Sequence, residues 1–344
     1  MAPSAVEVET PTVPDVAALK LQASLISPYR PEKLEATKYD TEAEAGLKSH
    51  KAAKNRNDKY PPLEPFEHYE HGKDADPSYP NLLPEGAVQV THLTPTIGTE
   101  VRGIQLSALT SAGKDELALE FGSYFGRHHI HPTSGAPAGY PEIHLVHRGA
   151  GDDSIDKYFA AHTSTVVWHS DVSYEQQPPG TTFLYALERP STRGDTLFAN
   201  AAEAYNRLSP LFQRRLHGLE ARHSAVEQAN DSVIRGGIKR REPVINEHPI
   251  VRTHFVTGEK AIYVNPQFTR DIVGLKKEES DAILKFLYGA DVHARVKWEE
   301  RTVVVGDNRL TQHSALVGWK DGQRRHLARI TPQAERPFET PFEK

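Results

Sequence analysis

Cysteine is absent from this sequence of 344 residues, and methionine occurs only once. Without cysteine the chain forms no disulfide bond, has no thiolate nucleophile and cannot bind zinc through sulfur, while the redox compartment stays open. No apolar run approaches the length of about 18 residues that a membrane-spanning helix needs. A glycine-rich phosphate loop and a regular alternation of strands with helices are also missing, so the sequence does not indicate a parallel α/β fold.

Positive charge is not in excess either: the formal net charge is −5 and the pI is near 6.4. This balance argues against general binding to nucleic acids or membrane surfaces. The N-terminal residues Met1–Ser4 lack the basic start and apolar core of a signal peptide, and the C-terminal residues Phe342–Lys344 are no peroxisomal address. We therefore expect a cytoplasmic protein that acts on a small molecule, with no nucleic-acid or membrane partner and with homo-oligomerisation left open.

The N-terminal part of the chain, residues 1–87, is polar and interrupted by prolines, and it shows no sustained apolar period. Such a segment buries too little apolar surface to fold alone, so we expect an extended, largely disordered arm. Its second half carries aromatic residues that could lie across the folded domain: Tyr60, Phe66, Tyr69 and Tyr79. The folded domain is expected at residues 88–338, followed by a C-terminal tail at 339–344.

Short alternating segments dominate the chain after residue 88. They predict strands at residues 88–93, 97–101, 143–147, 181–187, 195–199, 250–256, 261–264, 292–298, 302–305 and 329–331. Helical spacing predicts helices at residues 114–125, 202–219 with a break at Ser209–Pro210, and 278–288. Residues 224–249 lack a period and read as a long loop of lid size. The pattern predicts a mainly β fold with flanking helices (α+β) and a double-stranded β-helix core of jelly-roll or cupin type.

The stretch Val166–Val172 combines strand character with metal-binding chemistry. Residues two apart on a strand point to one face, so His169 and Asp171 are expected to project together. One imidazole and one carboxylate are two of the three ligands of a 2-His-1-carboxylate site for non-haem Fe(II). The chain has 18 histidines, so a lone His-x-Asp occurs about once by chance and is weak by itself. Our candidate for the third ligand is His313, although an ordinary surface or core histidine is the alternative.

Two arginines follow His313 at a spacing that suits anion binding. Arg325 and Arg329 are four residues apart, which places both on one face of a strand and lets one pocket hold two separate anions. A guanidinium binds a carboxylate with two parallel hydrogen bonds. The alternative is a basic surface turn over residues 323–326.

Together these motifs resemble the taurine dioxygenase family of Fe(II)/2-oxoglutarate-dependent oxygenases, and they are most similar to its fungal alkylsulfonate-dioxygenase branch. The resemblance covers residues 88–338. The matching segments are Phe125–Pro132, Trp168–Tyr174, Pro178–Gly180, Pro190–Thr196, and Asp307–Arg309 through His313 to Arg329.

The resemblance implies a role for each matching residue and a set of cofactors, namely Fe(II), 2-oxoglutarate and O2. The implied catalytic iron ligands are His169, Asp171 and His313, and the implied cosubstrate-binding residues are Thr196 and Arg325. The implied substrate-binding residues are His131, Trp168, Val172 and Arg329, with His131 and Arg329 on a sulfonate. The implied reaction hydroxylates an alkylsulfonate at the carbon next to sulfur and releases sulfite and an aldehyde, with succinate and CO2 as coproducts.

Two alternatives stay open at this point. The same cofactor chemistry could act on a carboxylate or amino-acid substrate, with Arg329 binding a carboxylate. The chain could also be a non-catalytic β-barrel metal-binding protein, because a strand that the family has after the first helix is missing after Leu119. The join near residues 288–290 is also short, and Gly306 replaces a common tryptophan.

Several polar residues outside the triad carry further expectations. Ser134 and Thr165 stand where taurine-specific relatives have donors for the amine, which favours a different or broader set of sulfonates. The basic run Arg235–Arg241 reads as a mobile lid segment rather than as a nucleic-acid patch. The remaining histidines near the site read as structural or solvent-facing: His128, His129, His144 and His147.

Overall fold

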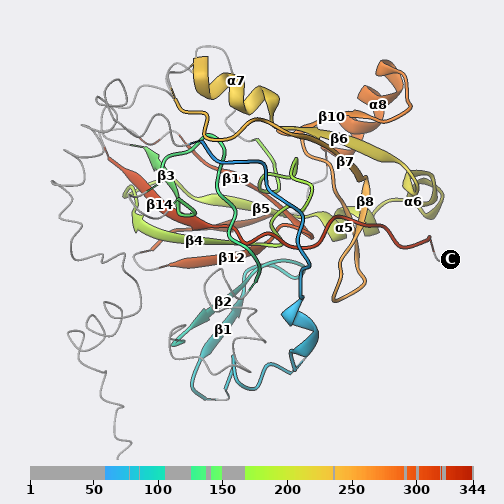
Figure 1. The fold of residues 1–344 in the computed structure, drawn as a ribbon. Helices are drawn as coiled ribbons and strands as arrows, with labels where there is room; N and C mark the ends of the chain where they lie inside the picture. The colour runs from blue at the N-terminus through green and yellow to red at the C-terminus, as the bar shows by residue number, and fades with distance from the viewer. Residues whose placement is uncertain are drawn as a thin grey trace, which may run out of the picture.

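The computed structural model describes residues 59–76, 78–84, 86–104, 125–136, 141–148, 167–234, 237–289, 293–299, 302–317, 319 and 323–342 (Figure 1). The helix predicted at residues 114–125 lies outside these residues, apart from Phe125. The strand missing after Leu119, the short join at Ala290, Thr165 and the arm before residue 59 also lie outside them.

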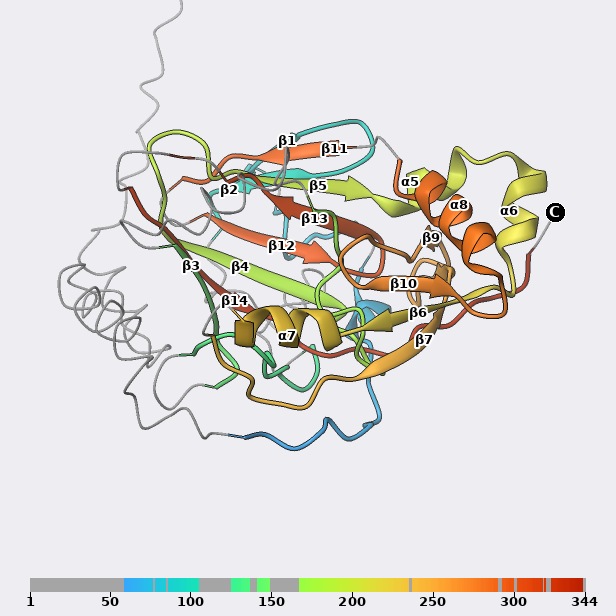
Figure 2. The same cartoon turned by 90° about the horizontal axis from the view of Figure 1, so that it is seen from above.

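Two antiparallel sheets form the centre of the protein and lie next to each other in both views (Figures 1 and 2). The four-stranded sheet has the order β12-β4-β14-β3, with β12 Val303–Asp307, β4 Thr181–Glu188, β14 Arg325–Ile330 and β3 His144–Arg148. The three-stranded sheet has the order β11-β5-β13, with β11 His293–Val296, β5 Thr196–Asn200 and β13 Thr311–Ala315.

Side chains of the two sheets meet between them. The cluster Leu184, Ala186, Trp298 and Leu327 packs around β4 and β14. Arg325 of β14 reaches Thr196 of β5. A Cβ added to Gly306 of β12 would lie 3.2 Å from the Phe198 ring of β5, so the glycine gives that ring its space. This arrangement confirms the predicted mainly β fold with flanking helices.

A smaller layer flanks these sheets and is built around a second core. It contains the sheet β10-β6-β7, formed by β10 Thr269–Ile272, β6 Glu220–Ser224 and β7 Ile245–Pro249, and the hairpin of β8 Val251–Thr253 with β9 Lys260–Ile262. Its helices are α5 Ala201–Asn206, α6 Pro210–Leu216, α7 Val226–Ile234 and α8 Lys277–Leu287. Leu216, Ile250, Val251, Ile272 and Leu284 are among the residues of this core.

The predicted break in the helix at 202–219 is confirmed. Ser209 caps α6, because its Oγ accepts a hydrogen bond from Phe212 N over 3.3 Å. Pro210 occupies the first helical turn, where its missing N–H costs no hydrogen bond. The helix predicted at 278–288 is likewise confirmed as α8.

The prediction of a long lid loop at residues 224–249 is wrong. The segment contains α7 and β7, and β7 pairs with β6 from Glu220↔Pro249 to Ser224↔Ile245. Ala229 is the buried residue of α7, and β7 has one buried residue, so neither element shows a clear apolar period. Arg240 and Arg241 are buried rather than part of a mobile basic surface.

The described part of the N-terminal arm is attached to the domain. Phe66 N donates to Gln177 Oε1 over 2.8 Å, and Gln177 Nε2 donates back to Phe66 O over 2.9 Å. After it come the one-turn helix η3 His71–Asp74 and the hairpin of β1 Gln89–His92 with β2 Thr99–Arg102, which the alternation predicted. Among the described residues, no helix is long and apolar enough to cross a membrane.

Replacing Leu216 with alanine is expected to lower the free energy of unfolding by about 2–5 kcal/mol, because a fully buried leucine leaves a cavity. Leu216 is 1% exposed, whereas Leu211 on the same helix is 61% exposed. Urea unfolding of Leu216→Ala and of the matched control Leu211→Ala measures the difference. Equal stability of the two variants would contradict the assignment of this core.

Candidate metal centre

The segment that carries His169 and Asp171 is not the strand that the sequence predicts. His169 forms an isolated antiparallel bridge with His313 of β13, in which His169 N donates over 3.1 Å and His313 N donates over 2.8 Å. Residues 171–174 then form a turn, with Val172 at φ +40°. The strand prediction is therefore wrong over the described part of 166–172, because a turn rather than the pleat of a strand brings Asp171 beside His169.

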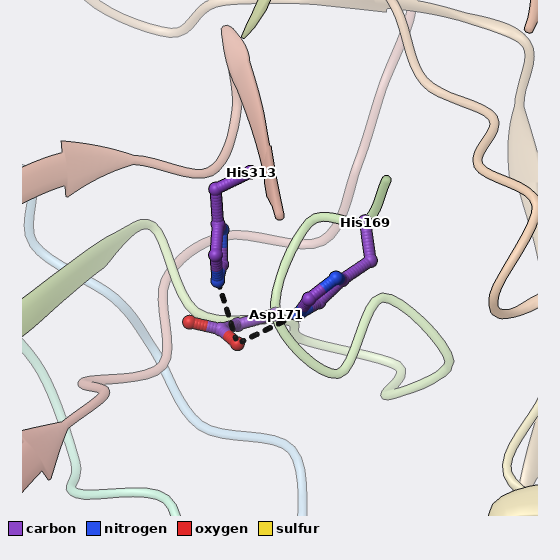
Figure 3. A group of neighbouring side chains, drawn as sticks. All are labelled: His169, Asp171 and His313. Atoms are coloured by element: carbon purple, nitrogen blue, oxygen red, sulfur yellow. Dashed lines mark ion pairs between the residues drawn. The ribbon is translucent and has the colours of Figure 1, made fainter. Parts of the chain in front are cut away.

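The three predicted ligands nevertheless come together (Figure 3). Asp171 Oδ1 lies 3.8 Å from His169 Nε2 and 3.8 Å from His313 Nε2. All three donor atoms lie within 4.8 Å of one another. Donor atoms that share one metal ion at about 2.1 Å are separated by about 3–4 Å, so little movement is needed to bind an ion.

Burial and charge set the protonation states that a metal requires. Burial lowers the pKa of His313 to about 3, with His169 adding to the effect, and burial also lowers the pKa of His169. Burial alone would raise the pKa of Asp171, but Arg329 and the two imidazoles outweigh it and hold that pKa well below its usual range. The site thus presents two neutral imidazoles and one carboxylate, which are the metal-binding forms.

Hydrogen bonds orient the ligands. His169 Nδ1 donates to Val167 O over 3.1 Å, which leaves the Nε2 lone pair on the side of Asp171. Asp171 Oδ2 accepts from Thr182 Oγ1 over 2.5 Å, and Thr182 Oγ1 accepts from Asn308 Nδ2 over 2.8 Å. Asn308 Oδ1 also accepts from Asp171 N over 3.1 Å. Asn308 therefore holds both the backbone and, through Thr182, the carboxylate of Asp171.

This donor set fits Fe(II). Two imidazoles and one carboxylate on one side of an ion form the facial triad of non-haem iron oxygenases and leave coordination positions open. Sequence reasoning found the three ligands but missed Asn308 and Thr182. The only available signal was that Asn308 belongs to the conspicuous Asp-Asn-Arg segment.

The two predicted cosubstrate residues also meet. Arg325 Nη2 donates to Thr196 Oγ1 over 3.1 Å, and Arg325 Nε donates to Gly194 O over 2.7 Å. Trp298 Nε1 donates to the same Thr196 oxygen over 3.2 Å. Because two donors occupy the lone pairs of that oxygen, its own O–H is left to donate to an anion. Burial lowers the pKa of Arg325 to about 10, so the guanidinium stays charged at neutral pH.

Arg329 connects the triad to a group of imidazoles. Its Nη1 donates to Asp171 Oδ1 and its Nη2 donates to His144 Nδ1. The His144 and His131 rings lie against each other with centroids 4.2 Å apart. His131 and Arg329 thus lie together beside the triad. His144, for which the sequence suggested a structural or solvent-facing position, contacts Arg329 and His131 in this cluster.

The structure does not place Trp168 and Val172 in this cluster. Trp168 stacks on His293 of β11, with ring centroids 4.6 Å apart. Val172 is 2% exposed and packs with Phe268, whose ring edge meets His169. Val172 therefore packs behind Phe268, which contacts the metal-ligand candidate His169. Trp168 faces β11.

A buried ion pair supports the loop that carries His131. Arg241 donates to both carboxylate oxygens of Glu175, and His129 Nε2 lies 2.9 Å from Glu175 Oε1. Burial alone would raise the pKa of Glu175, but His129 and Arg241 hold it at about 2. Arg240 N donates to Pro132 O over 2.6 Å. Arg240 and Arg241, which the sequence assigned to a mobile lid segment, therefore fix the loop around His131.

A second group of possible metal ligands consists of His68, Glu70 and Glu335. The positively charged side chain of Arg309 already lies beside its carboxylates. Arg309 Nη1 contacts Glu70 Oε2 and lies 3.6 Å from Glu335 Oε2. The guanidinium supplies the positive charge that these carboxylates need. We therefore interpret this group as an ion-pair network that attaches the arm, and not as a metal site.

Comparison with known proteins agrees with this geometry. The family described as "Taurine catabolism dioxygenase TauD, TfdA family" matches residues 101–331. The "Alpha-ketoglutarate-dependent sulfonate dioxygenase" of Saccharomyces cerevisiae is 44% identical over 314 residues, which cover 82% of this chain and 76% of that protein. An "Alpha-ketoglutarate-dependent dioxygenase" of Penicillium expansum is 41% identical over 323 residues, which cover 83% of this chain and 87% of that protein.

A solved structure supports the same relationship. The crystal structure of a taurine dioxygenase from Burkholderia xenovorans superposes with a TM-score of 0.58 at 27% sequence identity. The match covers 73% of this chain and 91% of that one. Related proteins with this fold thus carry the chemistry that the triad suits.

Metal affinity is expected to fall in a graded series of variants. His313→Ala should abolish measurable Mn²⁺ binding because it removes a ligand, whereas Asn308→Ala should weaken it by about 10–100-fold because it only loosens Asp171. His92→Ala is the control, since His92 lies exposed on β1 and should bind as the unaltered protein does. Isothermal titration calorimetry measures all three, and unchanged binding by His313→Ala would remove His313 from the site.

Proposed function

Because this chain belongs to the TauD, TfdA family of taurine-catabolism dioxygenases, we propose that it hydroxylates an alkylsulfonate at the carbon next to sulfur. The products are sulfite and an aldehyde, with succinate and CO2 as coproducts. The chain is an Fe(II)- and 2-oxoglutarate-dependent dioxygenase that consumes O2. The observation that carries the proposal is the position of Arg329, which contacts both the iron ligand Asp171 and the imidazole of His144.

In this proposal His169, Asp171 and His313 hold the iron. When bound, Fe(II) supplies the oxidising chemistry that couples the decarboxylation of 2-oxoglutarate to hydroxylation. The protein contributes fixed ligands, because Thr182 and Asn308 hold the Asp171 carboxylate in one orientation. Asp171 and His313 are buried and the His169 side chain is 18% exposed, which limits the access of water to the site.

Arg325 and Thr196 bind the C5 carboxylate of 2-oxoglutarate. The guanidinium is buried and charged, and Trp298 and Arg325 orient the Thr196 hydroxyl to donate. A carboxylate at this place would receive charge-assisted hydrogen bonds in a region from which water is largely excluded. Arg325 and Thr196 thus bind the cosubstrate, and Arg329 is available to bind the substrate.

Arg329 and His131 bind the substrate anion. A sulfonate is a permanent anion, and a guanidinium beside an imidazole donor suits its charge and its oxygens. Since the same guanidinium contacts Asp171, an anion bound there lies next to the metal centre with its adjoining carbon. That proximity is what selects the carbon next to sulfur for oxidation.

The substrate range is proposed to extend beyond taurine. Ser134 and Thr165 replace the donors that taurine-specific relatives place near the amine, so an amine is not required for binding. The Saccharomyces cerevisiae relative carries the broader name of a sulfonate dioxygenase. We further propose that residues 88–338 form the catalytic domain and that the protein acts in the cytoplasm on small anions, without nucleic-acid or membrane partners.

The proposal is tested by supplying Fe(II), 2-oxoglutarate and O2 with a panel of alkylsulfonates and matched carboxylates. Sulfite and succinate are expected in equal amounts with sulfonates, and Asp171→Ala should produce neither. Succinate formation with a carboxylate or amino acid, and no sulfite from any sulfonate, would support the carboxylate alternative instead.

Arg325→Lys is expected to raise the apparent KM for 2-oxoglutarate by about 10–100-fold, because one or two charged hydrogen bonds are lost while the charge is kept. Its KM for the sulfonate should change little. Arg324→Lys, at the neighbouring position, is the matched control. Steady-state kinetics at saturating sulfonate measures the difference, and an unchanged KM for 2-oxoglutarate would count against the assignment of Arg325.

A further inference from the structure

His144 is placed opposite Arg329 by the pairing of two strands that are far apart in the sequence. β3 and β14 are antiparallel neighbours, and their register pairs His144 directly with Arg329. The Arg329 guanidinium donates through Nη2 to His144 Nδ1 and through Nη1 to Asp171 Oδ1. The Arg329 guanidinium therefore bridges the His144 imidazole and the carboxylate of Asp171, the proposed iron ligand.

The hydrogen bonds define which nitrogen of each imidazole carries the proton. A guanidinium can only donate, so His144 Nδ1 accepts and the proton of a neutral His144 is on Nε2. His131 Nδ1 accepts from Thr133 N over 3.3 Å, which gives the same tautomer. Burial, with Arg329 as the next cause, holds the pKa of both imidazoles well below the usual value. Each ring thus has one N–H, at Nε2.

Arg329 adds an unused donor to these two. Its Nε is buried and has no hydrogen-bond partner among the residues that the structure describes. The residue is 7% exposed, so solvent offers little compensation. A buried donor without a partner is unfavourable, and an acceptor from a bound ligand would satisfy it.

We propose that His144 is a substrate-binding residue that makes the site selective for sulfonates over carboxylates. The inference rests on the proposed function and deepens it. Arg329, His144 and His131 lie in one cluster, and the Nε2–H groups of the two imidazoles and the Nε–H of Arg329 are three donors, as many as the terminal oxygens of a sulfonate. A carboxylate has two oxygens in one plane and leaves one donor without a partner, which disfavours it.

Two substitutions separate this role from a purely structural one. In His144→Asn the amide oxygen can replace Nδ1 as the acceptor for Arg329, but the far donor is lost. In His144→Gln the amide N–H can reach the position of Nε2, so the far donor is kept. A residue that only orients Arg329 would be replaced better by asparagine, whereas a residue that binds the substrate would be replaced better by glutamine.

The test is anaerobic calorimetry on the protein loaded with Fe(II) and 2-oxoglutarate, with 1-butanesulfonate and pentanoate as probes. His144→Asn is expected to raise the Kd for butanesulfonate by about 10–100-fold, because one hydrogen bond to a charged group is lost. The Kd for pentanoate should change by less than about threefold. His144→Gln should bind butanesulfonate within about threefold of the unaltered protein, and the Kd for 2-oxoglutarate should stay constant.

Other outcomes overturn the proposal. Unchanged butanesulfonate binding by His144→Asn, or equal losses in both variants, would mean that His144 only orients Arg329. If the asparagine variant does not fold, His144→Thr takes its place, because threonine suits a strand and also lacks the far donor. Failure of the proposed function looks different: the unaltered protein then binds no butanesulfonate and releases no sulfite.

Discussion

The buried guanidinium of Arg329 is the charge on which the site depends. It is 7% exposed and contacts Asp171 and His144 together. A charge in this position is stable only when it is paired, so the carboxylate must stay ionised. The same contact keeps the Asp171 carboxylate in its metal-binding form and places positive charge beside the candidate metal centre, where the proposed anionic substrate would lie. One ion pair thereby links the metal centre to substrate recognition.

Two hydrogen-bond networks hold this arrangement in place. On the metal side, Asn308 and Thr182 fix Asp171. Around His131, Arg241 and Glu175 form a buried ion pair that supports the loop carrying this residue. Buried polar networks of this kind are stable when their members are satisfied, and they then fix side chains in one orientation. The site is therefore preorganised before a ligand binds, which lowers the cost of ordering it.

The sequence predicted most elements that have a strong local signal, and it failed where that signal is weak. Strands such as β4 have five of their eight residues buried and contain a clear apolar run. The break before α6 was visible because serine and proline act locally, through a cap and a fixed φ angle. The segment 224–249 was misread because α7 and β7 bury few residues and gain their stability from neighbours such as β6. The strand assigned around His169 was misread because a turn begins at Asp171.

The sequence by itself determined the chemical types at the site: two imidazoles and a carboxylate for a metal, and two arginines four residues apart for two anions. These follow from side-chain chemistry and local spacing, which a linear sequence contains. Only the tertiary structure decided that His144 contacts Arg329, that Asn308 holds Asp171 and that Trp168 faces β11. Those assignments depend on the register between distant strands, such as β3 with β14. Register is set by packing across the whole domain, and neither strand encodes its partner.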